Sequence, residues 1–477
     1  MVVKIINYNW LSTSLLVFLL VIVGSVNSQQ ITLTLEESID TAMKNSLIVR
    51  TAEEKVKSAE QKVNEARSAM MPSASITGSY TYLGKTDTSS FSSLLGGGMG
   101  SFGAPAKIEG NGFGAMTGLP FTIKIPKDNY NVGLAVKQPL FTWGKIFNAY
   151  KQSKLALEAE KQGLESAKQQ VIFDTTKAFY GVLLADQLVK VTEMAVEQVQ
   201  AHVKVAQDLV NAGMATDFDL LRAKVQLANI RSQLIKMQNM SKLAKDGFKN
   251  TIGLSLDADI NLKGEITYRP LEVDLDSLIK TAMDRRPELK QLEIQEQIGE
   301  KIVSLAKAGN KPNLAFVYNY TYKSNADTIK DVFSQDKYKW NNSWNLTFAL
   351  SLPIFDGFAT RSRVNQAKSA VNQIKIGKEQ LINGIILDVR SSFMSFQEAK
   401  ELLKVQDETV QQAEESLRIA NLRYKNGMIT GVELMDAELA FTQAQTNYSN
   451  ALNDYVIAIA KLEKATASKL DQRFGGK

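Results

Sequence analysis

The sequence predicts a mainly α-helical, internally duplicated protein with a small β part suited to a membrane. Three observations predict this fold class: residues that recur once at a fixed spacing, two long stretches without proline, and four short segments that alternate apolar and polar side chains. The chain has 477 residues. That length exceeds one ordinary core, so the chain needs several units or one elongated architecture.

The amino-terminal residues resemble a secretory signal. Lys4 precedes the apolar run Leu15–Val23, and the small residues Ser25 and Ser28 follow it. We expect cleavage after Ser28, which makes residues 1–28 a signal peptide. An uncleaved membrane anchor is the alternative, but the run is shorter than the roughly 20 residues of a spanning helix.

The composition excludes several kinds of chemistry. The sequence has no cysteine, which rules out disulfides, thiolate catalysis and lipid attachment through a cysteine. His202 is the single histidine, so a histidine-rich metal site is excluded, and we interpret it as a satisfied surface residue of a helix. We therefore expect no enzyme activity, metal or cofactor. The formal charge is +6, but acidic and basic residues alternate, which gives no nucleic-acid site.

Two repeats make up the predicted mature chain. Early landmarks recur 240 residues later and later landmarks recur 214 residues later, so the spacing changes once, in the Gly- and Ser-rich loop at about Leu83–Asn129. We expect a first repeat at 29–253, an equatorial segment between the repeats at 254–274, and a second repeat at 275–477. The matched landmarks are Leu35 and Leu275, Pro72 and Pro312, Pro139 and Pro353, Phe179 and Phe393, and Gly213 and Gly427.

Four segments have the period of a β-strand with one apolar face. Trp344, Leu346 and Phe348 are apolar, for example, while Asn345 and Thr347 between them are polar. Each segment has about the 10 residues that a tilted membrane strand requires. The alternative is a soluble hairpin with one face on a core, but the neighbouring helices offer no covering layer. The expected strands are 73–83, 130–141, 313–322 and 343–353.

Four strands are too few to close a barrel. Single-chain barrels begin at about eight strands, and unpaired backbone groups in lipid cost several kcal/mol each. We therefore expect several chains to share one barrel.

The remaining sequence predicts long helices. No proline occurs between Pro139 and Pro270, or after Pro353, and both stretches are rich in Ala, Leu, Lys, Glu and Gln. A helix from Trp143 to Asn211 would be about 100 Å long. Helical segments at about Leu35–Met70 and Thr216–Ile252 are each near half that length. Narrow apolar stripes predict lengthwise packing: Val196, Val199, Val203, Ala206 and Val210, and, 214 residues later, Val410, Ala413, Leu417, Ala420 and Tyr424.

Several motifs resemble those of the TolC family over nearly the whole mature chain. They are Asn64–Ser68 ahead of Pro72, Gln138–Phe141, Leu352–Gly357, and the Gly-Met turns at Asn211–Thr216 and Lys425–Thr430. The resemblance implies a TolC-like fold: a homotrimer whose 12-stranded β-barrel lies in outer-membrane lipid and continues into a 12-helix periplasmic α-barrel. It implies a passive exit duct of a tripartite efflux or type I secretion system in a Gram-negative-type envelope, opening by untwisting of periplasmic helices.

The resemblance also implies partners and site residues. The partners are an inner-membrane transporter and a periplasmic adaptor (membrane fusion) protein, which would contact the tips at Gly213, Met214, Gly427 and Met428. The periplasmic aperture would carry Asp219, Tyr424, Glu433 and Asp436. Asp219 is expected to accept a hydrogen bond from Tyr424. The sequence departs from the family at Ile429, where a basic latch can sit, so the closing contact is expected to be weaker or built differently.

Two alternatives stay open at this point. Acidic residues near a helix start commonly offset the helix macrodipole and need no role in a channel. A periplasmic coiled-coil adaptor or scaffold protein of an export complex would also carry a signal peptide and long antiparallel helices. The alternating hairpins argue against an adaptor, which has no reason to turn a row of aromatic side chains toward lipid. The sequence leaves the transported substrate open.

Overall fold

A computed structural model describes residues 31–82, 84, 128–326 and 340–470 of the chain. The predicted signal peptide (1–28) and most of the predicted loop at Leu83–Asn129 lie outside the described residues. Within the described part, no helix combines the length and apolarity needed to cross a bilayer.

The chain folds into two compact units, and each unit contains segments from both predicted repeats. Unit 1 comprises Met1–Ala59, Ala156–Glu296 and Gln373–Lys477, as far as these ranges are described. Unit 2 comprises Glu60–Leu155 and Gln297–Asn372. The helices dominate unit 1, and unit 2 holds the larger sheet.

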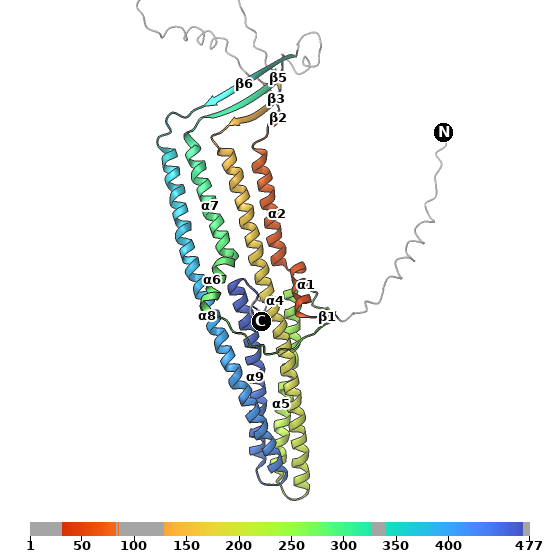
Figure 1. Cartoon of the computed structure of the whole chain (residues 1–477). Helices are drawn as coiled ribbons and strands as arrows, with labels where there is room; N and C mark the ends of the chain where they lie inside the picture. The colour runs from red at the N-terminus through yellow and green to blue at the C-terminus, as the bar shows by residue number, and fades with distance from the viewer. Residues whose placement is uncertain (1–30, 83, 85–127, 327–339, 471–477) are drawn as a thin grey trace, which may run out of the picture. The chain divides into compact units, whose positions relative to one another are not determined.

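The helices come in matched pairs, one from each repeat (Figure 1). The two members of a pair have 11 residues (α1 and α6), 67 residues (α4 and α8) and 36 residues (α5 and α9). Their starts are separated by the same 240 or 214 positions that relate the sequence landmarks. The bounds are α1 Leu35–Asn45, α2 Leu47–Ser68, α4 Lys145–Asn211, α5 Asp217–Ile252, α6 Leu275–Arg285, α7 Pro287–Lys307, α8 Ala359–Lys425 and α9 Gly431–Thr466.

The expected helix at Leu35–Met70 is two helices, with a break at Ser46. Ser46 has an extended ψ of 126° while its N–H still donates to the Ala42 carbonyl. The second repeat breaks at the equivalent Arg286, where ψ is 119°. Pro287 follows it, and a residue before proline is disfavoured in helical geometry. The first repeat has Leu47 in place of this proline, so no sequence signal marked its break.

Each repeat contributes a large apolar cluster to unit 1. In the first, α1 packs against α5 around Phe248 and Ile252, which are fully buried. In the second, α6 packs against α9 around Leu278 and Tyr455. A short parallel pair, β1 (Ile31–Leu33) with β4 (Ile260–Leu262), lies beside the first cluster and was not predicted.

Unit 2 contains a four-stranded sheet in the order β2-β3-β5-β6. Two antiparallel hairpins meet through β3 and β5, so β2 and β6 are the edges of the described sheet. Both hairpins have the same register, since Tyr80 faces Tyr130 in one and Tyr320 faces Trp344 in the other. The bounds are β2 Ser73–Tyr82, β3 Asp128–Phe141, β5 Asn313–Ala326 and β6 Asn341–Ser351. A single helical turn, η1 (Ala308–Asn310), precedes β5.

The edge strands leave large apolar side chains uncovered. Every residue of β6 is exposed, including Trp344, Phe348 and Leu350, which are 65 to 70% accessible. Every residue of β2 is exposed as well, including Ile76. In the described part of unit 2, this sheet therefore lacks the core that a soluble sheet would cover.

Candidate functional site: the two helix-to-helix turns

The predicted tips are two tight turns that join α4 to α5 and α8 to α9. Gly213 and Gly427 both adopt the left-handed conformation, with φ of 73° and 69°. Each glycine N–H donates to a carbonyl three residues back, and the next methionine N–H donates to one five residues back. This pattern is a Schellman motif, which ends a helix at a glycine. Met214 and Met428 follow with side chains 71% and 73% exposed.

Each return helix begins with a reciprocal capping box. At α9, Glu433 accepts from the Thr430 N–H at 2.7 Å, and its own N–H donates to the Thr430 hydroxyl at 3.3 Å. At α5, Asp219 and Thr216 make the same bonds at 3.1 and 3.3 Å. The Thr430 backbone and hydroxyl bonds lower the pKa of the Glu433 carboxyl, and the Thr216 hydroxyl and backbone bonds lower the pKa of Asp219. Capping is thus the first role of both acids.

Asp219 and Tyr424 do not form the expected hydrogen bond within the described chain. The carboxylate of Asp219 instead accepts from the hydroxyl of Thr216 at 2.7 Å. Tyr424 is buried, which raises the pKa of its hydroxyl, and the nearby charges of Asp219 and Glu438 raise it further. Its ring packs in an apolar cluster with Leu417 and Leu434.

Ile429 belongs to the same cluster. It packs against this cluster, as Val205 and Leu209 of α4 also do, so the two hairpins meet through apolar side chains near the second turn. At the position of the family's basic latch, this chain therefore has an apolar contact. Such contacts depend on area buried from water and do not weaken with salt as exposed ion pairs do.

Asp436 lies one turn beyond Glu433 on α9 and is exposed. Among the described residues it has no hydrogen bond or ion pair, so its charge faces solvent. The spacing of three places both carboxylates on neighbouring positions of one helix. The structure thus brings two acids close to the second turn and leaves one of them unengaged.

His202 is buried, so its interpretation as a surface histidine is wrong. It is 5% exposed, and its Nδ1 lies 3.4 Å from Oε2 of Glu438, which is 4% exposed. The edge of the imidazole also meets the ring of Tyr424, with centroids 5.0 Å apart. The sequence does contain a signal: the buried positions of α4 here are Ala195, Val199, His202 and Ala206, spaced by four, three and four.

The His202–Glu438 pair joins the two hairpins, since His202 lies on α4 and Glu438 on α9. Oε1 of Glu438 is buried and has no hydrogen-bond partner among the described residues, so the contact of Oε2 with the imidazole is the one polar contact of this carboxylate there. A β-carbon on Gly431 would stand 3.7 Å from Tyr424 and 3.8 Å from the imidazole, which leaves room for it only at van der Waals contact. The contact is specific, polar and sheltered from water.

No group of three or more potential metal ligands occurs among the described residues. The arrangement at the turns therefore offers caps, a buried interhelical contact and exposed acids.

Sequence comparison agrees with this geometry. Residues 38–253 and 278–468 match the model of the family "Outer membrane efflux protein". The chain belongs to this family. Its two matched ranges coincide with the two structural repeats, each ending at the close of a return helix, α5 or α9.

Individual members of the outer membrane efflux family are distant in sequence. The chain is 22% identical to the outer membrane protein TolC of Escherichia coli over 425 residues, covering 86% of this chain and 78% of that protein. It is 21% identical to TolC of Vibrio cholerae over 347 residues, covering 72% and 78%. It is 22% identical to the alkaline protease secretion protein AprF of Pseudomonas aeruginosa, covering 70% and 69%.

Solved channels of the family share the fold. The Campylobacter jejuni CmeC outer membrane channel superposes with a TM-score of 0.72 at 16% identity, covering 92% of this chain and 86% of that one. The open state of the Neisseria gonorrhoeae MtrE outer membrane channel gives 0.71 at 16%, covering 91% and 89%. The chain is therefore an outer-membrane efflux protein with a TolC-like, mostly helical fold, and family members serve as exit ducts of efflux and secretion systems.

Proposed function

We propose that three copies of this chain form one passive exit duct, with a shared 12-stranded barrel and a 12-helix barrel whose aperture lies at the Gly213 and Gly427 turns. The observation that carries the proposal is the internal repeat. Inside one chain, one edge of the first repeat contacts one edge of the second repeat. The other edge of each repeat is exposed, and the second repeat of one copy could contact the first repeat of the next copy in the same way.

The sheet edges are the first example. Inside the chain, β3 pairs with β5, with Val132 opposite Tyr322 and Leu134 opposite Tyr320. In the other repeat, β6 corresponds to β3 and β2 corresponds to β5, so the equivalent pairing between two copies is β6 against β2. Leu346 would then face Tyr82, and Phe348 would face Tyr80, in a neighbouring copy. Because both edges carry exposed apolar side chains and unpaired backbone groups, this pairing closes the sheet in lipid.

The helices of unit 1 follow the same rule. Inside the chain, α4 contacts the second repeat: Ser166 donates to Glu288 of α7 at 3.1 Å, and Lys464 of α9 stands 5.0 Å from the Phe173 ring centroid. The equivalent contacts between two copies would bring Gln380 of one copy near Ile48 of the next. They would also bring Leu387 near Asn250. All four of these residues are exposed in the single chain.

An exposed apolar stripe on α8 supports this interface. Leu387, Met394 and Val405 are 69, 68 and 54% exposed. Their counterparts on α4 are Phe173, Tyr180 and Val191, of which none is exposed. Exposed apolar rows of this kind mark protein interfaces. An interface that joins unlike surfaces, repeated around an axis, closes into a ring. Three copies give a barrel well above the minimum of about eight strands.

The aperture would be held shut by contacts between hairpins and opened by their separation. His202–Glu438 and the cluster around Ile429 supply the contacts within a chain. Glu433 and Asp436 from three copies would form an acidic ring that favours cations, while Met214 and Met428 would contact a periplasmic adaptor coupled to an inner-membrane transporter. The absence of cysteine and the predicted signal peptide agree with an exported protein.

Cysteine cross-linking tests the assembly, because the chain has no cysteine of its own. The variant Tyr80→Cys/Phe348→Cys should form disulfide-linked dimers and trimers on non-reducing gels. These residues lie on opposite edges of the four-stranded sheet, and the three strand spacings alone separate them by about 14 Å, which is too far for a bridge inside one chain.

The matched control is Ser73→Cys/Phe348→Cys, which moves one cysteine seven residues along β2 and should stay monomeric. The single variants should also stay monomeric. Monomers from the Tyr80/Phe348 pair in membranes would sink the shared barrel.

Ion selectivity tests the acidic ring. Glu433→Gln/Asp436→Asn should reduce the cation preference of the channel in a planar bilayer, most clearly at low salt. Asp454→Asn is the control, because Asp454 is exposed and lies on the same face of α9, about five turns farther from the Gly427 turn. Selectivity that stays unchanged in the double variant would refute the assignment of both residues.

A further inference from the structure

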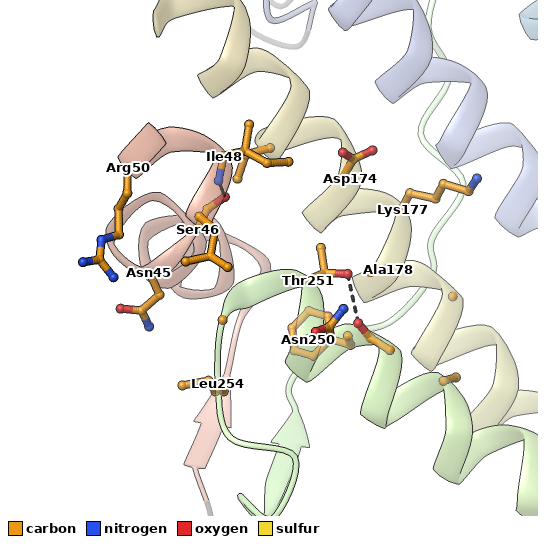
Figure 2. Close-up of a pocket in the computed structure, with 17 residues that line it drawn as sticks. Asn45, Ser46, Ile48, Arg50, Asp174, Lys177, Ala178, Asn250, Thr251 and Leu254 are labelled. Atoms are coloured by element: carbon orange, nitrogen blue, oxygen red, sulfur yellow. Dashed lines mark hydrogen bonds between the residues drawn. The ribbon is translucent and has the colours of Figure 1, made fainter. Parts of the chain in front are cut away.

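A cavity of about 960 Å³ opens in unit 1 at the break between α1 and α2 (Figure 2). Its walls come from the break itself, from α4 and from the end of α5. Ser46, Asp174 and Thr251 line three of its sides. Gly181 and Gly247 also line it, and a β-carbon added to either would meet no atom within 4 Å.

The second repeat fills the equivalent space with an arginine. Arg286 occupies the break between α6 and α7, and its Nε donates to the carbonyl of Ala465 at 2.7 Å. Its guanidinium also donates to the carboxylate of Asp388. The Arg286 side chain is 13% exposed, so it is packed in its cavity and joins three helices.

The repeat relation places an unfilled arginine site in the first repeat. The counterparts of Arg286, Asp388 and Ala465 are Ser46, Asp174 and Thr251, and all three line the cavity. Ser46 is too short to reach across, and its hydroxyl is used locally, accepting from the N–H of Ile48 at 3.2 Å. The acceptors for a guanidinium are thus kept, while the guanidinium is absent.

The acceptors remain available. Asp174 accepts from the Gln170 amide at 2.9 and 2.8 Å, which leaves lone pairs on both oxygens. The Thr251 carbonyl belongs to the last turn of α5, the negative end of the helix macrodipole. Two basic side chains, Arg50 and Lys177, also line the cavity. Figure 2 shows their charged ends directed away from Asp174.

We propose that this cavity binds a guanidinium group, held by the Asp174 carboxylate and the Thr251 carbonyl as Arg286 is held in the second repeat. A planar guanidinium donates two parallel hydrogen bonds to a carboxylate, and a further N–H reaches a second acceptor. An ammonium group lacks this planar pair of parallel N–H donors. The bound group would add a hydrogen-bonded link between α4, α5 and the α1–α2 break, which otherwise pack together through apolar side chains. The inference goes beyond the proposed duct and is argued from the contacts of a single chain, although Ile48 and Asn250, which line the cavity, also lie at the proposed interface between copies.

Ligand binding to the purified full chain in detergent tests the site. The probes are ethylguanidinium and, as the matched cation, propylammonium, followed by saturation-transfer NMR. Ethylguanidinium should bind saturably and more tightly than propylammonium. Asp174→Asn and Ser46→Arg should each weaken that binding at least about tenfold, the first by removing the charged acceptor and the second by filling the cavity.

Asp388→Asn is the matched control, because it removes the equivalent carboxylate where Arg286 already sits, and ethylguanidinium binding should be unchanged. Ser46→Ala should also retain binding. Equal binding to the wild type and to Ser46→Arg, equal binding of the two cations, or no saturable binding would each overturn the proposal. Thermal melts of every variant show whether the protein is still folded.

The same experiment separates the two sources of a guanidinium. A blocked tripeptide Gly-Arg-Gly and its Gly-Lys-Gly control present the group on a polypeptide. Competition between the arginine peptide and ethylguanidinium supports a site for an arginine side chain of a partner. Binding of ethylguanidinium alone supports a site for a small guanidino compound.

Discussion

The glycines of the two turns adopt a conformation that a side chain disfavours. Gly213 and Gly427 have φ of 73° and 69°, and a β-carbon there would meet no neighbour within 4 Å, so strain and not space decides the outcome. Replacing either by alanine should lower stability by about 1 kcal/mol. Thermal melts followed by circular dichroism measure this. Gly384→Ala, in the regular part of α8, should instead be neutral or stabilising.

The Glu433 cap makes one turn sensitive to acid. Hydrogen bonds from Thr430 hold the pKa of this carboxyl below its ordinary value of 4.5. A lowered folded-state pKa means that the cap stabilises the turn above about pH 4.5 and is lost as the pH falls through the lower, folded value. The Thr430 amide, which donates to Glu433, should therefore lose hydrogen-exchange protection in acid and in Glu433→Gln.

Asp436→Asn should leave the protection of the Thr430 amide unchanged, because Asp436 has no bond to the turn among the described residues. Equal loss of protection in both variants would show that net charge, and not the cap, controls the turn.

For single residues, the sequence predicted features that depend on neighbours in the chain and missed contacts between residues far apart in the sequence. A glycine after a helical stripe has a strong backbone signature, so both turns were found where expected. The sequence alternative for Asp219 and Glu433 was that acids near a helix start offset the macrodipole, and the structure shows that both acids also form capping boxes, which local geometry explains. The His202–Glu438 pair was missed, because it joins residues 236 positions apart on helices whose rotation about their own axes is set by tertiary packing.

Among the elements, α4 and α9 are joined by a buried polar contact. His202→Ala would leave the Glu438 carboxylate buried without compensation, and we expect a loss of about 3 to 5 kcal/mol. Glu438→Ala should cost less, because a histidine can remain neutral. The double variant should cost less than the sum, and a thermodynamic cycle of chemical denaturation measures the coupling. Lys57→Ala, which breaks an exposed pair with Glu54, should have little effect, because water screens that pair.

The same substitution should affect the channel if the pair holds two hairpins together. His202→Ala should raise the open probability in planar bilayers, whereas Lys57→Ala should not. A destabilised protein with unchanged gating would restrict the pair to a folding role.

Element types were readable from periodicity, and their relations were not. Expected strands at 73–83 and 343–353 compare with Ser73–Tyr82 and Asn341–Ser351, since alternation over about 10 residues is a strong local signal. The β3–β5 pairing and the short β1–β4 pair depend on contacts distant in sequence. The break at Ser46 carries no proline, so a helix-forming stretch concealed it.

For the whole molecule, the exposed stripe of α8 should control assembly. Met394→Lys places a charge in the proposed interface and should convert trimers to monomers in mild detergent, because burying an unpaired charge is costly. Size-exclusion chromatography with light scattering measures the mass. Ser391→Lys is the control, since its repeat counterpart, Lys177, is an exposed lysine. Trimers that persist in Met394→Lys would place the interface elsewhere.

The matched lengths of the long helices constrain how this chain can evolve. The outgoing helices have 67 residues each and the returning ones 36 each. Deleting one heptad from α4 alone would shift its turn by about 10 Å along the bundle and separate His202 from Glu438. A shorter or longer descendant therefore needs concerted insertions or deletions in all four helices, whereas single substitutions at exposed positions outside the proposed interface are free to accumulate.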